Sequence, residues 1–572
     1  MSVLTQARDL PAAEAQGVRP VPQGRSAPSP RPLNPLAERL LIIGLDGATF
    51  DVLDPLMAAG HMPHLARFIR EGVSGVLQST RPPITPAAWT TFMTGKGPGK
   101  HGIVDFEKYD VRTHTLTFNS TYEIQEKTLW ELLSEKGLRV GSINVPMTYP
   151  PRPVNGFMIS GFETPSIDAD FTWPRELKAE ILREIPNYSY RTNWKRRAFG
   201  GSAILRENLE YICNSFEQGW EITRYCGDKY GWDVLMIVYK LVDNLQHKAW
   251  KYLDPRYQHR YPAQARMAAE CFRKLDEALE RLFEYAERYR ATVLIMSDHG
   301  HGSLDGKAQP NLLLQEWGYL HLRSRWQQAE TRAGHWLHRL TKGRANRFEQ
   351  GSRGIERDLA VDWERTRACV MHAGIYGFLY INLKGRGPLG IVEPQEYEAL
   401  RDEIRGRLLA AETTGRDGRP MRIFADVFRT EQLYGCTREE HPDLPDLLLS
   451  PQPGLAVVRK IRGRQPVRWC PLRRLEGTHR AEGVFAMRGP KVRRGERLEA
   501  DIVDLTPTAL AALGMRVPVD MEGRVLSEAF VTQPLVEREP PIRKALEEHG
   551  EVYSEEDRKV LEKRLSELGY LE

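Results

Sequence analysis

Two short apolar runs each end in side chains that can bind a metal ion. The run 292–296 is followed by Ser-Asp-His-Gly, which sets Asp298 and His299 side by side, and the run 40–45 is followed by Asp46. Each run is β-rich and too short to span a membrane, so each predicts a buried strand. Open α/β sheets build their sites at the carboxyl ends of strands. These groups therefore predict a hydrolytic metal centre.

Further segments carry groups that can join this centre. Asp243 lies four residues before His247 in a helical pattern, so both side chains share one helical face and can reach one ion. Thr85 precedes a proline at the expected start of another helix, where backbone N–H groups attract phosphoryl oxygens. A late histidine, His479, stands in Glu-Gly-Thr-His. A threonine hydroxyl so placed is a candidate nucleophile, because a bound metal would lower its pKa.

Mixed carboxylate and imidazole ligands favour one class of metal chemistry. Such sets suit Zn²⁺, and Mn²⁺ is the alternative. Two ions about 4 Å apart can clamp the attacking and leaving oxygens of an in-line displacement at phosphorus. We therefore expect two divalent cations, a small-molecule phosphate ester as the substrate, and hydrolysis as the reaction.

The order of these groups along the chain resembles the alkaline phosphatase superfamily. It runs Asp, Thr at a helix start, Asp-x-x-x-His, Asp-His-Gly and a final His, and is most similar to the type I phosphodiesterase and nucleotide pyrophosphatase branch. The resemblance covers about 37–526. It implies an α/β fold: an alkaline-phosphatase-like core with a mostly parallel central sheet flanked by helices, plus an inserted cap subdomain.

The resemblance also implies roles for the residues, three ligands for each metal ion and one nucleophile. One ion would be held by Asp243, His247 and His479, and the other by Asp46, Asp298 and His299, with Thr85 touching the second ion. The reaction would then pass through a phospho-threonine intermediate that an activated water hydrolyses.

Each of these residues also has a structural alternative. Asp46 can start a turn, Thr85 and Asp243 can cap helices, and His247 can be a packed or surface histidine. A capping role for a threonine is compatible with nucleophilicity. The metal interpretation is preferred because the groups occur together in order.

Three other histidines are not assigned to the metal ions. His301 follows the Asp-His pair closely, and we expect it to lie beside the ligands or to serve the fold. His101 is expected to hold the turn at Gly102. His441 lies in the same part of the chain as His479, but the Pro-Asp that follows it is typical of the entry to a strand.

One position departs from the family pattern and leaves the substrate open. Nucleotide pyrophosphatases usually follow His-Gly-Ile-x-Asp with an Asn that helps to hold a phosphoryl oxygen, but here 101–105 is followed by Phe106. That phosphate contact is missing or supplied from elsewhere. The expected activity is that of a phosphodiesterase. The alternatives are a phosphomonoesterase, a phosphonate hydrolase or a phosphomutase on the same site, and a catalytically silent protein that binds a phosphorylated ligand.

Strand and helix patterns alternate at the spacing of βαβ units, which predicts a mostly parallel sheet covered on both faces. Strands are expected at 40–45, 75–78, 234–239, 292–296, 377–383 and 444–449, and helices at 62–71, 86–93, 208–225, 261–289, 394–409 and from 554 on. Ser554 and Asp557 resemble a capping box for the last helix, whose apolar stripe is expected to dock on the body or on a second subunit.

These patterns divide the chain into five segments. They are a disordered leader rich in Pro, Ser and Ala (1–36), the first part of a catalytic core (37–319), an inserted cap (320–430), the second part of the core (431–530) and a charged helical tail (531–572). Within the cap, 323–357 is strongly basic and predicts either a solvated helix or a surface for an anion or a partner.

Composition narrows the class of protein and its partners. The chain has 572 residues, 41% hydrophobic and 27% charged, with a net charge of +5, which is ordinary for a globular protein and gives no indication of nucleic acid binding. No run is long and apolar enough to span a bilayer. The six cysteines show no close pairing and the start of the chain lacks a signal core, so free thiols and a cytoplasmic location are expected. A homodimer is a further expectation.

Overall fold

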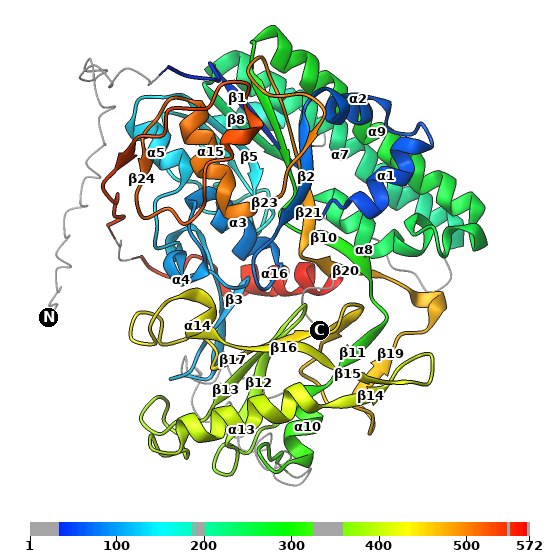
Figure 1. Cartoon of the computed structure of the whole chain (residues 1–572), viewed down its shortest axis with the longest axis vertical. Coiled ribbons are helices and arrows are strands. Elements are labelled where there is room, and N and C mark those ends of the chain that lie inside the picture. The colour runs from blue at the N-terminus through cyan, green and yellow to red at the C-terminus, as the bar shows by residue number, and fades with distance from the viewer. Residues whose placement is uncertain (1–33, 186–187, 189–200, 324–358, 546–548, 569–572) are drawn as a thin grey trace, which may run out of the picture. The chain divides into compact units, whose positions relative to one another are not determined.

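A large mixed sheet forms the centre of the computed structural model (Figure 1), which describes residues 34–185, 188, 201–323, 359–545 and 549–568. Most of the predicted leader and nearly all of the basic segment 323–357 lie outside the described residues. Within those residues the sheet has ten strands. Their order is β22 (Glu496–Arg497), β2 (Val73–Gln78), β21 (Glu482–Arg488), β9 (Thr292–Met296), β1 (Leu40–Gly44), β8 (Val234–Val238), β5 (Val140–Val145), β6 (Gly156–Ser160) and β7 (Thr172–Trp173), with β23 (Ala500–Asp501) paired to β2.

The pairing is mostly parallel, as predicted, but one interior strand runs the other way. β1 pairs in parallel with β8 and β9, and β5 with β6 and β8. β21 lies antiparallel between β2 and β9. The register sets Gly44 opposite both Val238 and Met296. The chain segments that follow β1, β8 and β9 therefore leave the sheet at one edge.

Both faces of the sheet are covered because its strands are apolar on both sides. Leu41 and Ile43 of β1 belong to a core cluster shared with the helices of one face, whereas Leu40 and Ile42 belong to a cluster on the other face. The first face carries α1 (Phe50–Ala58), α2 (Pro63–Glu71), α7 (Gly201–Tyr230), α8 (Leu241–Leu253) and α9 (Pro262–Arg288). The second carries α3 (Thr85–Thr94), α5 (Leu129–Glu135) and α15 (Leu505–Ala512).

A second sheet, which is antiparallel, has a hydrophobic core of its own. Its strands, in order, are β12 (Ala368–Ala373), β13 (Gly377–Ile381), β17 (Leu447–Pro451) and β16 (Phe424–Arg429), and α13 (Tyr397–Ala410) packs with them. The strand expected near 444–449 as a return to the first core thus pairs here instead. The apolar run of this strand predicts that it is buried, but it does not predict which of the two sheets the strand joins. The boundaries 320–430 for an inserted cap stay a prediction.

Short elements complete the described chain. The strands are β3 (Glu107–Asp110), β4 (Thr115–Phe118), β10 (Gly300–Ser303), β11 (Gly306–Ala308), β14 (Glu412–Thr414), β15 (Pro420–Arg422), β18 (Leu455–Val457), β19 (Val467–Trp469), β20 (Gly477–Arg480), β24 (Val517–Pro518) and β25 (Arg538–Glu539). The helices are α4 (Pro98–His101), α6 (Leu177–Glu184), α10 (Pro310–Glu316), α14 (Thr430–Tyr434) and α16 (Glu555–Leu568), with five 3₁₀ turns among the described residues at Thr121–Glu123, Gln258–Arg260, Leu472–Arg474, Ile502–Asp504 and Ser527–Ala529.

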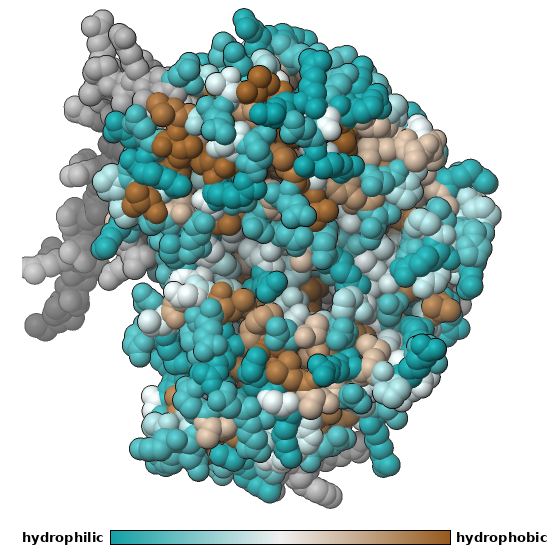
Figure 2. Space-filling model, in the orientation of Figure 1, coloured by the Kyte–Doolittle hydropathy of each residue, from teal (hydrophilic) through white to brown (hydrophobic). Residues whose placement is uncertain are grey.

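The face of the molecule drawn in Figure 2 is mainly hydrophilic. On the face drawn in Figure 2, hydrophobic residues lie in scattered groups among hydrophilic ones. In the described ranges, no helix is both long and apolar enough to cross a bilayer. The six cysteines are free thiols.

Candidate metal and phosphoryl-transfer centre

Three neighbouring strands deliver the predicted groups to one edge of the sheet. Asp46 follows β1, Asp298 and His299 follow β9, and α8 begins three residues after β8. Asp46 and Asp298 have no exposed surface, and the backbone N–H of Gly47 donates to Asp298 Oδ1 at 2.9 Å. The convergence expected from two separate apolar runs is therefore present.

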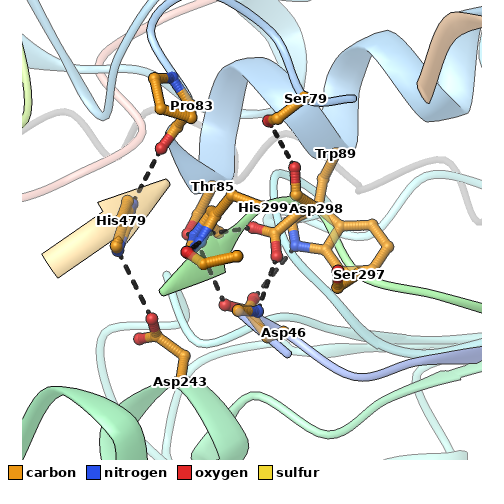
Figure 3. A network of polar contacts seen from close by, with 12 residues as sticks. Asp46, Ser79, Pro83, Thr85, Trp89, Asp243, Ser297, Asp298, His299 and His479 are labelled. Carbon is orange, nitrogen blue, oxygen red and sulfur yellow. Dashed lines mark hydrogen bonds and ion pairs between the residues drawn. The ribbon is translucent and has the colours of Figure 1, made fainter. Parts of the chain in front are cut away.

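The helical spacing of Asp243 and His247 also has the predicted effect. Both lie in the first two turns of α8, and His247 Nε2 is 3.2 Å from Asp243 Oδ1. The N-cap position of this helix is Lys240, so Asp243 is not the cap. Its carboxylate points into the centre rather than along the helix axis toward solvent, as Figure 3 shows.

Pairing of β10 with β20 adds two histidines at once. The antiparallel register sets His301 directly opposite His479, and both rings are buried. His479 Nε2 lies 3.4 Å from Asp243 Oδ1, and His301 Nε2 lies 3.3 Å from the same oxygen. His301 was expected beside the ligands or in the fold, but it contacts the same carboxylate oxygen as the assigned ligands His247 and His479.

The four imidazoles share one orientation. The Nδ1–H of His247 donates to the Gly477 carbonyl at 3.0 Å, and that of His479 to the Pro83 carbonyl at 2.9 Å. His301 and His299 donate in the same way to the carbonyls of Gly47 and Gly300. A carbonyl can only accept, so each neutral ring carries its lone pair on Nε2. Hydrogen bonds of this kind are the ones that orient histidine ligands of metals.

At the centre, the Nε2 atoms and carboxylate oxygens are hydrogen-bond acceptors that lie close together, and they outnumber the hydrogen-bond donors around them. His247 Nε2 and His479 Nε2 lie 2.9 Å apart, although both are acceptors in this tautomer. Among the described residues, buried Asp298 Oδ2 and His301 Nε2 have no hydrogen-bond partner. Two groups have the proximity that a metal ion requires: Asp243, His247, His301 and His479 form one, and Asp46, Asp243 and His299 form the other. The donor set therefore fits two divalent cations.

The close approach of His301 and the backbone conformation at position 47 both require a glycine there, Gly47. Its φ is +69°, in the left-handed region, and a Cβ on it would lie 2.6 Å from His301 Cε1. The carbonyl of the same residue accepts from His301 Nδ1 at 2.8 Å. A side chain at this position would therefore push the imidazole out of the centre.

Lys240 was not predicted and supplies positive charge inside the cluster. Its Nζ donates to Asp46 Oδ1 at 3.0 Å and to Asp243 Oδ2 at 2.7 Å, and its side chain is 7% exposed. Lys240 is three residues from Asp243 but 194 residues from Asp46, so a lysine near Asp243 gave no sign of its pairing with Asp46.

Burial and mutual charge set the pKa values of these groups. Burial and the neighbouring Asp298 raise the pKa of Asp46 well above its ordinary value. Burial also opposes ionisation of Asp243, but Lys240 and His247 outweigh it and hold the pKa of Asp243 well below its usual range. Burial lowers the pKa of His479 to about 4 and keeps the pKa of His299 and His301 well below the ordinary value. Neutral imidazoles are the form that binds metals.

Thr85 begins α3 beside these ligands (Figure 3). Its Oγ1 lies 3.4 Å from His299 Nε2, and one turn later Trp89 Nε1 donates to Asp46 Oδ2 at 3.0 Å. The N-cap residue is Ile84, so Thr85 is not the helix cap. Its hydroxyl therefore faces the centre from a helix N-terminus.

A hydrophobic cluster surrounds the start of α3. It contains Ile84 and Ala87 on either side of Thr85, together with Phe106, Phe162 and Leu565. Leu565 belongs to the tail helix α16, so the tail docks on the body of the chain here (Figure 1). Arg564 next to it donates to the Thr164 carbonyl at 2.8 Å.

Residues near the His-Gly-Ile motif have structural partners. His101 Nδ1 accepts from Ile103 N at 3.1 Å and its other ring nitrogen contacts Thr91 Oγ1, which confirms its role in the turn. The Phe106 ring is buried edge-on against Phe162, at a centroid distance of 5.4 Å. An aromatic ring thus stands at the position where the resemblance predicts an amide side chain. His441 donates to the Gly99 carbonyl, outside the centre.

A second buried cluster of acids and a histidine lies between β3 and β12. His372 Nε2 is 2.8 Å from Asp105 Oδ2, and His372 Nδ1 is 3.7 Å from Glu107 Oε2. Burial lowers the pKa of His372, but the two carboxylates outweigh it and raise that pKa. Burial raises the pKa of Glu107 to about 7. No local pattern predicted this cluster, because His372 lies 267 residues from Asp105 in the chain.

Comparison with known proteins assigns the chain to a family. The sequence model described as type I phosphodiesterase / nucleotide pyrophosphatase matches residues 40–483. Comparison with curated proteins gave no match. Solved structures similar in fold include murine ectonucleotide pyrophosphatase / phosphodiesterase 5, an inactive form in complex with AMP, at 12% identity and TM-score 0.47, covering 84% of this chain and 95% of the other.

Another is phosphonoacetate hydrolase from Sinorhizobium meliloti 1021. Its complex with phosphonoformate is 16% identical with a TM-score of 0.48, and its complex with phosphonoacetate is 15% identical with a TM-score of 0.49. Each alignment covers 82% of this chain and 95% of the other.

Proposed function

The chain belongs to the type I phosphodiesterase and nucleotide pyrophosphatase family, whose members are hydrolases of phosphate esters, and on that premise we propose that it cleaves phosphodiesters with Thr85 as the nucleophile. The observation that supports this most directly is the contact of Thr85 Oγ1 with His299 Nε2 at 3.4 Å, at the start of a helix and next to two potential metal groups. A hydroxyl in that place needs activation, and the surrounding acceptors can hold the cations that would provide it.

The residues that would hold the two ions follow from the grouping of donor atoms. Asp243, His247, His301 and His479 would hold one ion, and Asp46 and His299 would hold the other next to Thr85, with Asp243 within reach of both ions. Asp298, whose Oδ2 lies 3.3 Å from His299 Nε2, would join the second set. When bound, the ions would lower the pKa of the Thr85 hydroxyl and offset the charge on the phosphoryl oxygens. Zn²⁺ is the proposed metal because imidazoles dominate the first group, and Mn²⁺ is the alternative.

The chain itself would contribute positioning and charge. The Thr85 oxygen forms a bond to phosphorus while the bond to the leaving alcohol breaks, and water then hydrolyses the phospho-threonine and restores the hydroxyl. The N-terminus of α3 attracts the phosphoryl oxygens. Trp89, through its bond to Asp46, and the four backbone carbonyls, through the imidazoles, fix the ligands before the substrate arrives.

Phe106 bears on the choice of substrate. The buried Phe106 and Phe162 rings adjoin Ile84 and Ala87 around the nucleophile, so this side of the centre is apolar. An apolar wall favours an ester with an apolar or aromatic substituent over one that needs an amide contact to a phosphoryl oxygen. A phosphomonoesterase, a phosphonate hydrolase and a phosphomutase are the competing activities of the same centre.

The test compares two aryl esters and two variants. Metal-loaded protein is assayed with bis-p-nitrophenyl phosphate and p-nitrophenyl phosphate beside Thr85→Ala, with Thr85→Ser as the matched variant that keeps a hydroxyl. We expect faster cleavage of the diester, a loss on the order of 10³-fold or more in Thr85→Ala, and measurable activity in Thr85→Ser.

Metal content by inductively coupled plasma mass spectrometry accompanies each assay. Faster cleavage of the monoester moves the assignment to a phosphatase or mutase, and release of phosphate from phosphonoacetate moves it to a phosphonate hydrolase. Full activity in a metal-loaded Thr85→Ala protein would overturn the nucleophile. A fully loaded wild type that binds phosphate but cleaves none of these compounds would support a binding protein.

A further inference from the structure

A basic cleft lies beside the centre but shares none of its ligands. Its volume is about 660 Å³, which lies in the range of small-molecule sites. The lining includes α8 after His247, the segment 304–307, the loop 460–462, β19 and the turn before His479. Eight of its side chains are cationic: Lys248, Lys251, Lys307, Lys460, Arg462, Arg468, Arg473 and Arg474.

Positive side chains outnumber negative ones among the described lining residues of this cleft. Glu476 is the one carboxylate among the described lining residues, and its Oε1 is 3.9 Å from Lys248 Nζ. The whole chain has a net charge of +5, so eight cations at one cleft are a strong local concentration. Such a cleft with low-dielectric walls raises the local concentration of anions.

Two of the cations are placed where the fold alone disfavours them. β19 pairs with β11 in antiparallel register, and Arg468 stands directly opposite Lys307. Like charges directly opposite each other on adjacent strands destabilise a sheet. An anion bound between them would convert this repulsion into attraction.

The backbone around the cleft is fixed, so the cations do not depend on a flexible loop. Buried Gln309 accepts from Arg462 N at 2.7 Å and donates to the carbonyls of Arg462 and Gln465 at 3.0 and 2.7 Å. Lys251 Nζ donates to the Arg473 carbonyl at 3.0 Å. These bonds hold in place the loop and the turn that carry the arginines.

We propose that this cleft binds a small polyanion, a molecule carrying several phosphate or sulfate groups, at a site separate from Thr85. The concave shape and limited volume favour a compact ligand. Lys248 directly follows His247, and Glu476 lies three residues before His479, so a ligand here would contact both elements that carry those histidines. The proposal does not depend on the catalytic role of Thr85.

The probe is myo-inositol hexasulfate, a compact polyanion without a phosphate ester to hydrolyse. Isothermal titration calorimetry on the metal-loaded full chain is expected to give one site per chain, with weaker binding at higher salt. Lys307→Ala/Arg468→Ala is expected to raise Kd at least about tenfold. Lys384→Ala/Arg494→Ala, which removes two exposed cations outside the cleft, is expected to change Kd less than about twofold.

A second measurement separates binding from folding. Without the probe, the midpoint of thermal unfolding of Lys307→Ala/Arg468→Ala should equal or exceed that of the wild type, because a like-charge pair is removed. Equal Kd in wild type and this double variant, or an equal loss in the control, would overturn the proposal. Loss of binding in Thr85→Ala, or binding of a single-stranded oligonucleotide where hexasulfate does not bind, would do the same.

Discussion

Two buried clusters in this chain are built from the same residue types, histidine and carboxylates, but they differ in the groups that the imidazole nitrogens face. In the centre around Asp243, four imidazoles donate through Nδ1 to backbone carbonyls and turn Nε2 inward. In the cluster around His372, both ring nitrogens face carboxylates. The first arrangement brings the lone pairs of several Nε2 atoms together, as a metal site requires. In the second, the positive charge is on the histidine itself.

The difference lies in what the imidazoles are bonded to. A ring between Asp105 and Glu107 is stabilised as imidazolium, so that cluster balances its charge without help. Burial lowers the pKa of His299, His301 and His479, so these rings are neutral. Neutral rings that turn their Nε2 lone pairs toward each other can hold a cation from outside. Residue type therefore does not distinguish a metal site from an internal ion pair, but the groups that face the two ring nitrogens do.

Removing the carboxylate shared by the two metal groups should give the largest effect. Asp243→Asn keeps the shape of the side chain but removes its charge from both groups. We expect loss of bound metal and a fall in phosphodiesterase activity on the order of 10³-fold or more. Metal analysis and the aryl ester assay measure both. The control Asp105→Asn, in the second cluster, should leave the metal content of the protein unchanged. Equal loss of metal in both variants would contradict the distinction between a metal centre and an internal ion pair.

Deleting the internal cation of the second cluster should cost stability instead. His372→Ala leaves two buried carboxylates without their imidazolium, so urea unfolding should show a loss of about 3–5 kcal/mol. Metal content should be unchanged in the folded protein. His259→Ala, at an exposed position, is the matched control and should unfold like the wild type. A stable His372→Ala protein would show that the pair is not charged.

The same cluster predicts a pH dependence. Glu107 is faced by Asp105, His372, Arg459 and Glu562, and its pKa is raised from 4.5 to about 7. Its contribution to folding is therefore fully present below pH 4.5 and is lost as pH rises through about 7. Relative to Glu107→Gln, the wild type should lose on the order of 3 kcal/mol over that window. Parallel stability curves for the two proteins would contradict the raised pKa.

A smaller change tests whether His301 belongs with the metal ligands. His301→Ala removes one Nε2 from the group of four and should weaken the affinity for Zn²⁺ by about 10–100-fold, measured by competition with a chelator. His441→Ala removes an imidazole bonded to the Gly99 carbonyl outside the centre and should leave the affinity unchanged. Equal affinities in all three proteins would return His301 to a structural role.

Local signals predicted much of the fold and of the centre. Continuous apolar runs identified β1 and β9, and i, i+4 spacing placed Asp243 and His247 on one face of α8. The parallel sheet followed from alternating patterns. Each of these patterns is formed by residues of a single helix or strand, or of neighbouring elements in the chain, so it can be recognised without knowledge of distant contacts.

Contacts set by distant pairings were not predictable in the same way. The role of His301 depends on the register between β10 and β20, and Lys240 meets Asp46 across 194 residues. The antiparallel position of β21 likewise depends on two strands that lie far earlier in the chain. Periodicity reports which face is buried but carries no information on the neighbour.

The place of β21 links completion of the sheet to completion of the centre. It lies between β2 and β9, and His479 stands a few residues before it. During synthesis on a ribosome, the first 300 residues can therefore supply Asp46, Thr85 and Asp298 but leave β2 without its neighbour. Non-local pairings of this kind form late. Acquisition of the full complement of metal would thus mark the moment at which the segment that carries His479 and β21 has joined the body of the chain.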